Sequence, residues 1–200
     1  MPRPRTLTDE IVLDRAVGVF WRHGYADASL RDLTSVTGLS AASLYHRYRD
    51  KDGLFTAVLD RYAQQGLTSR LARLTAIADP LAAIRQFFDE IIDLSINDPD
   101  RLGCLLVNSV LDGGKMSQAA RNTARTRLGE VETFFRIQLE KARASGTTHP
   151  GIEPAVMAEI LLAAVLAIRV LARLAPERER LERLVAHALT SVSLSIPAPK

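Results

Sequence analysis

The sequence contains a single cysteine, Cys104, among 200 residues. One thiol cannot form an intrachain disulfide, and it provides no cysteine-based zinc site. The four histidines, His23, His46, His149 and His187, lie in separate segments without the short spacing typical of metal ligands. We therefore expect neither a metal nor another cofactor. We expect Cys104 to be a small buried hydrophobic residue rather than a redox-sensing thiol, because no neighbouring pattern indicates an acidified environment.

Long hydrophobic runs are also missing. The longest strictly apolar stretch is nine residues, from Ile160 to Ile168, and Arg169 ends it. A helix that crosses a bilayer needs about 20 such residues. The N-terminal residues include two arginines but no apolar core behind them, which is unlike a signal peptide. The sequence therefore predicts a soluble cytoplasmic protein with no membrane segment.

Neither sign of charge dominates the chain. It has 26 basic and 23 acidic residues, a net charge of +3, and an isoelectric point near 9.3. Through residue 52 there are eight Lys or Arg against seven Asp or Glu. This weak basic excess is compatible with nucleic acid but does not argue for it. Any surface that binds DNA must therefore arise from where the charges are placed.

Strand patterns are absent as well, because no segment alternates apolar and polar residues or carries a β-branched run between turns. Joints such as Asp79-Pro80 separate segments with helical spacing, and Asp98-Pro99 resembles an N-cap followed by a first-turn proline. The sequence predicts an all-α fold. Its helices, about nine in number, are expected at 8–23, 29–36, 40–46, 50–75, 80–96, 99–112, 117–144, 154–174 and 177–193.

The helices change character near residue 50. Those before it are short, whereas those after it are long and rich in alanine and leucine. Short helices must share one core. We therefore expect two domains, 1–52 and 53–200, with helix 50–75 running from the first into the second. The predicted core of the first domain consists of Ile11, Ala16, Phe20, Leu30, Leu33, Val36, Leu39, Leu44 and Tyr48.

The stretch Ser29–Lys51 has the pattern of two short helices joined by a turn that contains Gly38. Ser29, in a capping box with Asp32, is the predicted cap of the first helix, and Ser40 is the predicted cap of the second. Such a turn sets two helices at roughly 90–120°, and glycine supplies the positive φ that the chain needs there. Small residues from Ser40 to Ser43 open the second helix and allow a close approach to DNA. Side chains that donate to phosphate oxygens follow them. The pattern predicts a helix-turn-helix whose second helix enters a major groove.

About the first 55 residues resemble the DNA-binding domain of the TetR/AcrR family of transcriptional regulators. The resemblance is carried by Ile11, Ala16, Phe20, Gly24-Tyr25, Ser29-Leu-Arg-Asp-Leu33, Gly38-Leu-Ser40, Leu44-Tyr45, Tyr48, Lys51 and Leu54-Phe55. It implies that residues 40–46 are the recognition helix. The remaining 145 or so residues match the family in architecture alone.

The resemblance also implies roles for individual residues. Ala41, Ala42, Ser43 and His46 take base-facing positions, and two alanines there favour thymine-methyl contacts or shape readout. Positions that face the DNA backbone are occupied by Ser29, Arg31, Tyr45 and Lys51. The hydroxyl of Ser40 is a donor suited to bases or phosphates. Arg47 and Arg49 either contact DNA or face solvent, and in isolation Lys51 would be an ordinary surface lysine. The predicted DNA-binding residues are thus Ser29, Arg31, Ser40, Ala41, Ala42, Ser43, Tyr45, His46, Arg47 and Lys51.

Family architecture implies a homodimer in which the last two helices pair with their copies. Helix 154–174 is apolar on nearly every face and helix 177–193 on one stripe, as burial between two subunits requires. The predicted interface residues are Ile160, Val165, Leu181, Leu184, Val185 and Ala188. Residues of the C-terminal helices, most of them apolar, are candidates to line a ligand pocket, although each taken alone fits plain core better. They are Phe87, Phe88, Ile91, Leu105, Asn108, Leu111, Phe134, Gln138 and Ile168.

The resulting hypothesis is a ligand-responsive transcriptional regulator. That it is a repressor is implied by the family resemblance alone. It would bind a pseudo-palindromic stretch of double-stranded operator DNA as a dimer and be released by a small-molecule effector. One alternative is a DNA-binding regulator without a small ligand. A second is a helical-bundle enzyme or carrier, which would need an ionisable cluster that the inward-facing positions of the C-terminal helices barely offer. We therefore expect no enzymatic activity.

Overall fold

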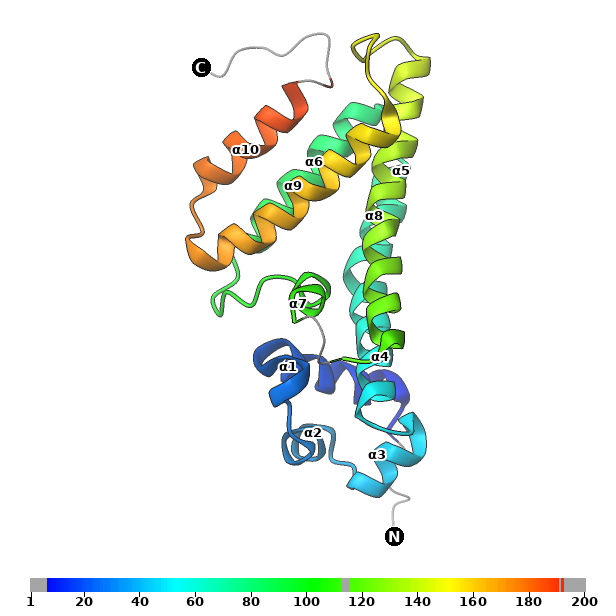
Figure 1. The fold of residues 1–200 in the computed structure, drawn as a ribbon, viewed down its shortest axis with the longest axis vertical. Coiled ribbons are helices and arrows are strands. Elements are labelled where there is room, and N and C mark those ends of the chain that lie inside the picture. The colour runs from blue at the N-terminus through cyan, green and yellow to red at the C-terminus, as the bar shows by residue number, and fades with distance from the viewer. Residues whose placement is uncertain (1–6, 113–115, 191, 193–200) are drawn as a thin grey trace. The chain divides into compact units, whose positions relative to one another are not determined.

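We describe a computed structural model that covers residues 7–112, 116–190 and 192. Those residues contain helices and no β-strand (Figure 1). The helices are α1 (Asp9–Asp27), α2 (Leu30–Thr37), α3 (Ala41–Tyr48), α4 (Lys51–Tyr62), the π-helix η1 (Ala63–Thr68), α5 (Ser69–Thr75), α6 (Pro80–Ile96), α7 (Leu105–Leu111), α8 (Gln118–Ala144), α9 (Pro154–Leu174) and α10 (Arg178–Thr190). The predicted all-α class is confirmed.

Most helix boundaries lie within two residues of their predicted places. The continuous segment 51–75 was expected as one helix, and it contains six residues of π-helix between α4 and α5. Counted as one, it gives the nine helices expected, within the part of the chain that the structure describes. Helix α1 leaves helical geometry at Gly24, where φ is 71°, so its first stretch ends at His23 as predicted. The predicted end of the last helix at 193 lies outside the described residues.

The predicted helix 99–112 is wrong in its first half. Only Leu105–Leu111 is helical. The Asp98 side chain accepts hydrogen bonds from the backbone of Asp100 (3.2 Å) and Gly103 (3.1 Å), which closes a turn in place of capping a helix. Arg101 and Gly103 have φ of 50° and 74°, and an α-helix cannot contain such residues.

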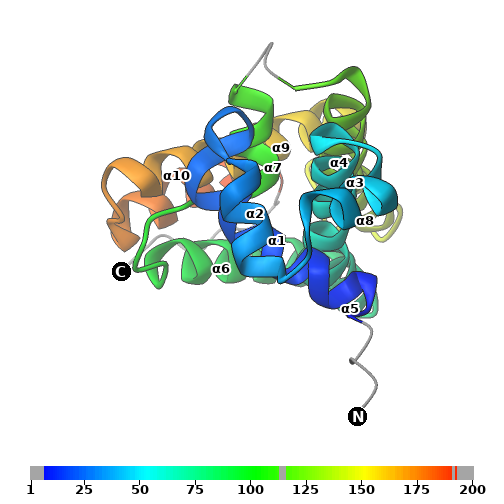
Figure 2. The same ribbon diagram turned by 90° about the horizontal axis from the view of Figure 1, so that it is seen from below.

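The chain forms two compact units, residues up to 67 together with 104–127, and residues 68–103 together with 128–200. In the first, α1 packs against α4, α2 and α7, and α3 against α4. Figure 2 looks onto this unit from the end where α2 and α3 lie. Its core includes Phe20, Leu33 and Leu44 as predicted, but Ile11 and Val36 are exposed. Helix α4 contributes further residues to this core, namely Leu54, Phe55, Val58 and Leu59.

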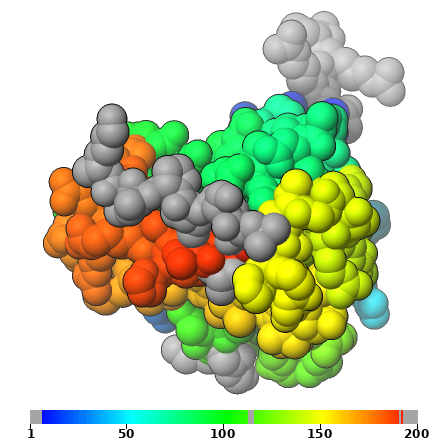
Figure 3. Space-filling model, turned by 90° about the horizontal axis from the view of Figure 1, so that it is seen from above, coloured from blue at the N-terminus to red at the C-terminus, as the bar shows by residue number. Residues whose placement is uncertain are grey.

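In the second unit α6 packs against α9, α5 and α10, and α9 packs against α10. Figure 3 shows the outer surface of α10, in orange, beside the yellow segment around residue 150. Four rings from α6 and α8 meet in the interior, where Phe87 lies 5.0 Å from Phe135 and Phe88 stacks on Phe135 at 5.4 Å, centroid to centroid. These contacts join α6 to α8.

Helix α9 is long and apolar enough to cross a membrane by length and composition alone. Its most apolar window of 18 residues has a mean hydropathy of 2.3, and 44% of that window is buried inside the chain. The core helix of a soluble protein has the same composition. Since α9 packs against both α6 and α10, its apolar character is used in tertiary packing.

Arg169 is an exception to the apolar interior of α9, because only 7% of it is exposed. Its guanidinium donates to the hydroxyl of Ser95 (2.8 Å) and to the carbonyl of Gly103. Ser95 lies in the last turn of α6, where the helix dipole places partial negative charge that stabilises a cation. Gly103 has φ of 74°, and a Cβ there would also lie 2.8 Å from Cδ of Arg173, so glycine is favoured at this position. Arg169 therefore holds the turn that follows α6 against α9.

We predict that Arg169→Met lowers the free energy of unfolding by about 3 kcal/mol, because it leaves a buried carbonyl and hydroxyl without their donor. The control is Arg180→Met on α10, an exposed arginine that should change stability by no more than about 0.5 kcal/mol. Denaturant titration of both variants checks this. Equal stabilities for the two variants would contradict the assigned role.

Candidate nucleic-acid interface

The turn between α2 and α3 is built from local hydrogen bonds. Ser29 caps α2 by accepting from the backbone of Asp32 (3.1 Å), and its hydroxyl donates to the Asp32 carboxylate (2.6 Å). That hydrogen bond lowers the pKa of Asp32. Gly38 ends α2 in the left-handed conformation, with φ of 72°, and Ser40 caps α3 by accepting from the backbone of Ser43 (3.2 Å). The predicted caps and the predicted glycine turn are confirmed.

Helix α3 presents most of its surface outward. Leu44 is its one buried residue and holds the helix against the unit's core. Ala42, Ser43 and His46 are exposed, and Ala41 is half-buried. A helix with one buried anchor and small outward side chains can approach another surface closely with its backbone. This geometry fits the groove-entering helix expected from the sequence.

Arg47 and Tyr48, at the end of α3, contact the start of α1. The Arg47 guanidinium donates to the Leu7 carbonyl (2.9 Å) and to the Asp9 carboxylate (3.2 Å). The Tyr48 hydroxyl also donates to Asp9, at 3.2 Å. Burial, with the negative charge of Asp9, raises the pKa of Tyr48 to about 12. Arg47 is therefore part of a link between α3 and α1, although its side chain is on the surface.

Lys51 is the first residue of α4 and is half-buried. Its ammonium donates to the Ala26 carbonyl (3.0 Å) and lies 4.9 Å from the centroid of the Tyr25 ring. Burial lowers the pKa of Lys51, and burial together with a hydrogen bond to Asp52 raises that of Tyr25 to about 12. An ammonium has three donors, so this geometry leaves others for a phosphate at the N-terminus of α4. The phosphate contact itself stays a prediction.

Other predicted contacts lie on the same unit. Ser29, Arg31 and Ser40 are exposed at the starts of α2 and α3, and Tyr45 is 36% exposed. The predicted DNA-binding residues therefore come from the end of α1 to the start of α4, and none is fully buried.

Arg49 connects α3 to α4 in an unfavourable backbone conformation. Its φ is 73° and its ψ is −53°, a region that residues with a Cβ rarely adopt. Its N–H donates to the Tyr45 carbonyl and so ends α3, and Asp50 then caps α4 by accepting from Gly53 (2.8 Å). The two helices are joined without any further residue, and the sharp change of direction imposes the strain.

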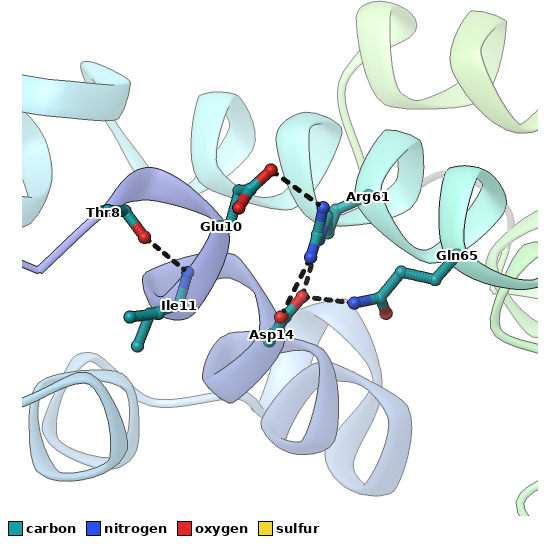
Figure 4. Close-up of polar contacts among 6 residues, drawn as sticks. All are labelled: Thr8, Glu10, Ile11, Asp14, Arg61 and Gln65. Atoms are coloured by element: carbon teal, nitrogen blue, oxygen red, sulfur yellow. Dashed lines mark hydrogen bonds and ion pairs between the residues drawn. The ribbon is translucent and has the colours of Figure 1, made fainter.

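A polar network that was not predicted from the sequence joins α1 to α4 (Figure 4). Asp14 accepts from Nε (2.7 Å) and Nη2 (3.1 Å) of Arg61, and from the amide of Gln65 (2.7 Å), while Glu10 pairs with Arg61 at 3.5 Å. The hydrogen bond from Arg61 lowers the pKa of Asp14. Gln65 belongs to η1, so the π-helical segment is itself attached to α1. A local sequence pattern cannot predict a contact between residues that are 47 positions apart, as Asp14 and Arg61 are.

The predicted pocket residues divide between the two units. Phe87, Phe88 and Phe134 belong to the aromatic cluster of the second unit, with Phe87 and Phe134 5.8 Å apart, and Ile91, Gln138 and Ile168 are buried in that unit. Leu105, Asn108 and Leu111 lie on α7 in the first unit. Leu111 is 64% exposed at the end of α7, and its place in a ligand pocket stays a prediction.

A shallow cavity of about 290 Å³ lies elsewhere in the second unit, and none of the predicted pocket residues lines it. Its walls are His149, Gly151, Ile152, Glu153, Val156 and Met157. Among the residues described, no group of three His, Cys, Asp or Glu side chains could hold a metal ion. Cys104 is half-buried at the start of α7, not buried as predicted.

The predicted interface residues also divide by burial. Val165, Leu181 and Val185 are already covered by their own chain, so their contact with a partner subunit stays a prediction. Ile160 is 45% exposed, and Leu184 and Ala188 are half-buried. The outward face of α9 carries further apolar residues that were not among the predicted interface residues, although they recur with the same spacing of three and four positions as Ile160. They are Val156, Ala163, Ala167, Val170 and Leu174.

Comparison with known proteins gives matches over both units. Residues 12–58 match the family described as bacterial regulatory proteins, tetR family, and residues 80–188 match the tetracyclin repressor-like C-terminal domain. The HTH-type transcriptional repressor ComR of Escherichia coli K12 is 32% identical over 200 residues, which cover 96% of this chain and 90% of that protein.

Solved structures agree with these matches. A cysteine mutant of the TetR family transcriptional regulator CifR, bound to 26-base-pair double-strand operator DNA, has a TM-score of 0.83 and 29% identity, covering 94% of this chain and 99% of that one. The reduced form of E. coli NemR also has a TM-score of 0.83, at 21% identity, covering 95% of this chain and 98% of that one, and shows the shared fold.

We predict that Arg49→Gly raises the free energy of unfolding by about 1 kcal/mol, because glycine adopts positive φ without steric cost. Arg49→Ala serves as the control, since it removes the same charge but keeps the Cβ. It should be no more stable than the wild type. Thermal unfolding of the three proteins decides, and a glycine variant no more stable than the alanine variant would exclude backbone strain at this joint.

Proposed function

Given that this chain belongs to the TetR family of bacterial transcriptional regulators, we propose that it is a repressor released from DNA by a small molecule. In this proposal it binds pseudo-palindromic operator DNA in the cytoplasm as a homodimer. Residues 1–52 act as the DNA-binding domain and residues 53–200 as the ligand-binding and dimerisation domain. The observation that carries the proposal is the exposure of α3. This helix follows the glycine turn, is capped by Ser40, and is attached to the core of its unit by Leu44.

Recognition is assigned to two groups of residues. Ala41, Ala42, Ser43 and His46 face base edges from α3, where the small side chains permit close approach and apolar contact with thymine methyl groups. The phosphate-facing group surrounds α3 and orients it, since phosphate contacts set register and supply the salt-dependent part of affinity. That group is Ser29, Arg31, Ser40, Tyr45, Arg47 and Lys51. In this proposal Arg47 uses N–H donors beyond the one that contacts Leu7 and Asp9.

The names of two relatives support repression through operator DNA. ComR is named a transcriptional repressor, and the CifR mutant was solved with operator DNA. The helix-turn-helix of this chain has the local geometry that such binding uses, including two hydroxyl caps and the positive φ at Gly38. No excess of basic residues is required, because the donors are concentrated between the starts of α2 and α4.

Dimerisation is assigned to the exposed stripe of α9 with α10 beside it. The stripe recurs at intervals of three and four residues, from Val156 through Ile160 to Leu174. Such spacing keeps one face of a helix toward a partner helix, and an apolar stripe of this length is rarely left in water. Two copies would align two α3 helices with major grooves about 34–36 Å apart. Leu184 and Ala188 extend the same interface on α10.

Release is assigned to a population shift. A small molecule bound in the C-terminal domain favours a dimer whose recognition helices are wrongly spaced. Coupling of about 1–3 kcal/mol between the two sites is sufficient for regulation of this kind. Candidates for the binding site are the members of the predicted pocket that are buried in the second unit, on α6, α8 and α9, namely Phe87, Phe88, Ile91, Phe134, Gln138 and Ile168.

We predict that Lys51→Met weakens binding to DNA similarly for all sequences and reduces the slope of log K against log salt concentration. The reduction should be about 0.9 per subunit and about 1.8 for a dimer, because each lost phosphate contact releases fewer counterions. Fluorescence anisotropy with a selected operator and a random duplex at several salt concentrations measures it. Lys141→Met, an exposed lysine on α8, is the matched control and should leave the slope unchanged. A slope equal to that of the wild type would remove Lys51 from the phosphate group.

We predict that Ile160→Glu converts the dimer to a monomer at about 10 μM, because a carboxylate on an apolar interface is costly to desolvate. Ile137→Glu on α8 is the control, since Ile137 is 37% exposed but lies off the stripe, against 45% for Ile160. Sedimentation velocity distinguishes the two states. An Ile160→Glu protein that remains dimeric would place the interface elsewhere.

A further inference from the structure

Gln138 on α8 has a buried amide nitrogen without a hydrogen-bond partner. Only 1% of the residue is exposed, and its amide nitrogen contacts no acceptor among the described residues. Buried polar groups are almost always paired, and leaving one unpaired destabilises the fold. The unpaired nitrogen of Gln138 is therefore a donor available to an acceptor that is not part of the chain.

The position of Gln138 on α8 places it beside the aromatic cluster. Phe134 and Phe135 precede it by four and three residues, and such neighbours share one face of a helix. Both rings are buried, and both contact Phe87, at centroid distances of 5.8 and 5.0 Å. Gln138 therefore lies on the same face of α8 as the two rings, one helical turn closer to the C-terminus of the helix.

We propose that Gln138 is the polar anchor for the effector, and that the effector is a neutral, largely apolar molecule carrying a hydrogen-bond acceptor such as a carbonyl oxygen. This inference rests on the proposed function, since it names the ligand class of the same site. The rings of α6 and α8 supply the apolar surface, and the amide nitrogen supplies the single directed hydrogen bond that orients the molecule.

Charge considerations favour a neutral ligand over an anion. The buried residues of α6 carry no charge, and neither do those of α8 among the residues described. The one buried arginine in this unit, Arg169, already donates to Ser95 and to Gly103. A carboxylate placed beside the rings would meet no cation and would be desolvated at high cost.

The packing of the rings connects binding to conformational change. Phe88 and Phe135 are stacked with an interplanar angle of 8°, and Phe87 contacts both rings of α8. A molecule that reaches this surface must separate α6 from α8, so it binds the separated arrangement better than the closed one. This difference in affinity is the condition for a ligand to shift a population.

The test compares ligands that differ in one acceptor. Acetophenone is paired with α-methylstyrene, and methyl naphthyl ketone with isopropenylnaphthalene, because each pair has nearly the same shape. Binding is measured by calorimetry and by release of a fluorescent operator selected from random DNA. The wild type should bind the ketone of a pair at least about tenfold more tightly than the hydrocarbon, since a donor left unpaired by the hydrocarbon disfavours its complex.

Gln138→Met replaces the amide with an apolar side chain of similar length. This variant should bind both members of a pair equally. Without ligand it should unfold about 2–4 °C higher than the wild type, because an unpaired buried donor has been removed. The matched control is Thr148→Val, which removes another buried and unpaired polar atom of the same unit. It should raise the unfolding temperature likewise but keep the preference for ketones.

Several outcomes would overturn the inference. They are no preference for ketones in the wild type, a preference that survives in Gln138→Met, no binding of any ketone at millimolar concentration, or a Gln138→Met protein that unfolds below the wild type. Operator binding without ligand is measured for every variant. Failure of ketone selectivity with operator binding intact rejects only the ligand class, whereas loss of operator binding in the wild type rejects the proposed function itself.

Discussion

The position of α3 depends on the packing of α1 against α4, because α3 has little to hold itself in place. A helix of eight residues is unstable alone in water, and α3 buries Leu44 and no other residue. Helix α4 receives α3, and α1 fixes α4 through buried rings such as Phe20 and Phe55, whose centroids lie 4.8 Å apart. The network around Asp14 adds polar contacts on the same pair of helices. The face of α3 that is proposed to contact DNA can therefore consist of small and polar residues, because α1 and α4 hold the helix from its other side.

The second unit differs from the first in that its helices carry more apolar surface than the unit itself covers. Helix α9 packs inward against α6 and α10, and still exposes an apolar stripe. Ionisable groups inside are correspondingly few, and Arg169 is accommodated by carbonyl and hydroxyl oxygens near the end of α6. In such an interior an unpaired polar atom is unusual, and the amide nitrogen of Gln138 is for this reason the basis of the proposed ligand contact.

Local sequence signals predicted the structure correctly where one residue determines the backbone conformation of its neighbours. They gave a wrong prediction where the same residue can make more than one set of hydrogen bonds. Ser29, Gly38 and Ser40 predicted two caps and a turn because each acts on its immediate neighbours. Asp98-Pro99 has the same appearance as an N-cap, yet the Asp98 side chain closes a turn onto Gly103. The π-helix within 51–75 was equally invisible, because its sequence is compatible with an ordinary α-helix.

The sequence by itself determined the all-α class, most helix boundaries and the placement of a helix-turn-helix, because caps, glycines and apolar spacing act within a few residues. Only the tertiary structure decided which apolar side chains are covered. It placed Leu181 and Val185 inside the subunit, Ile11 at its surface, and Arg47 against Asp9. The physical reason is that burial and pairing depend on which helices meet, and residues that meet across helices lie tens of positions apart in the chain.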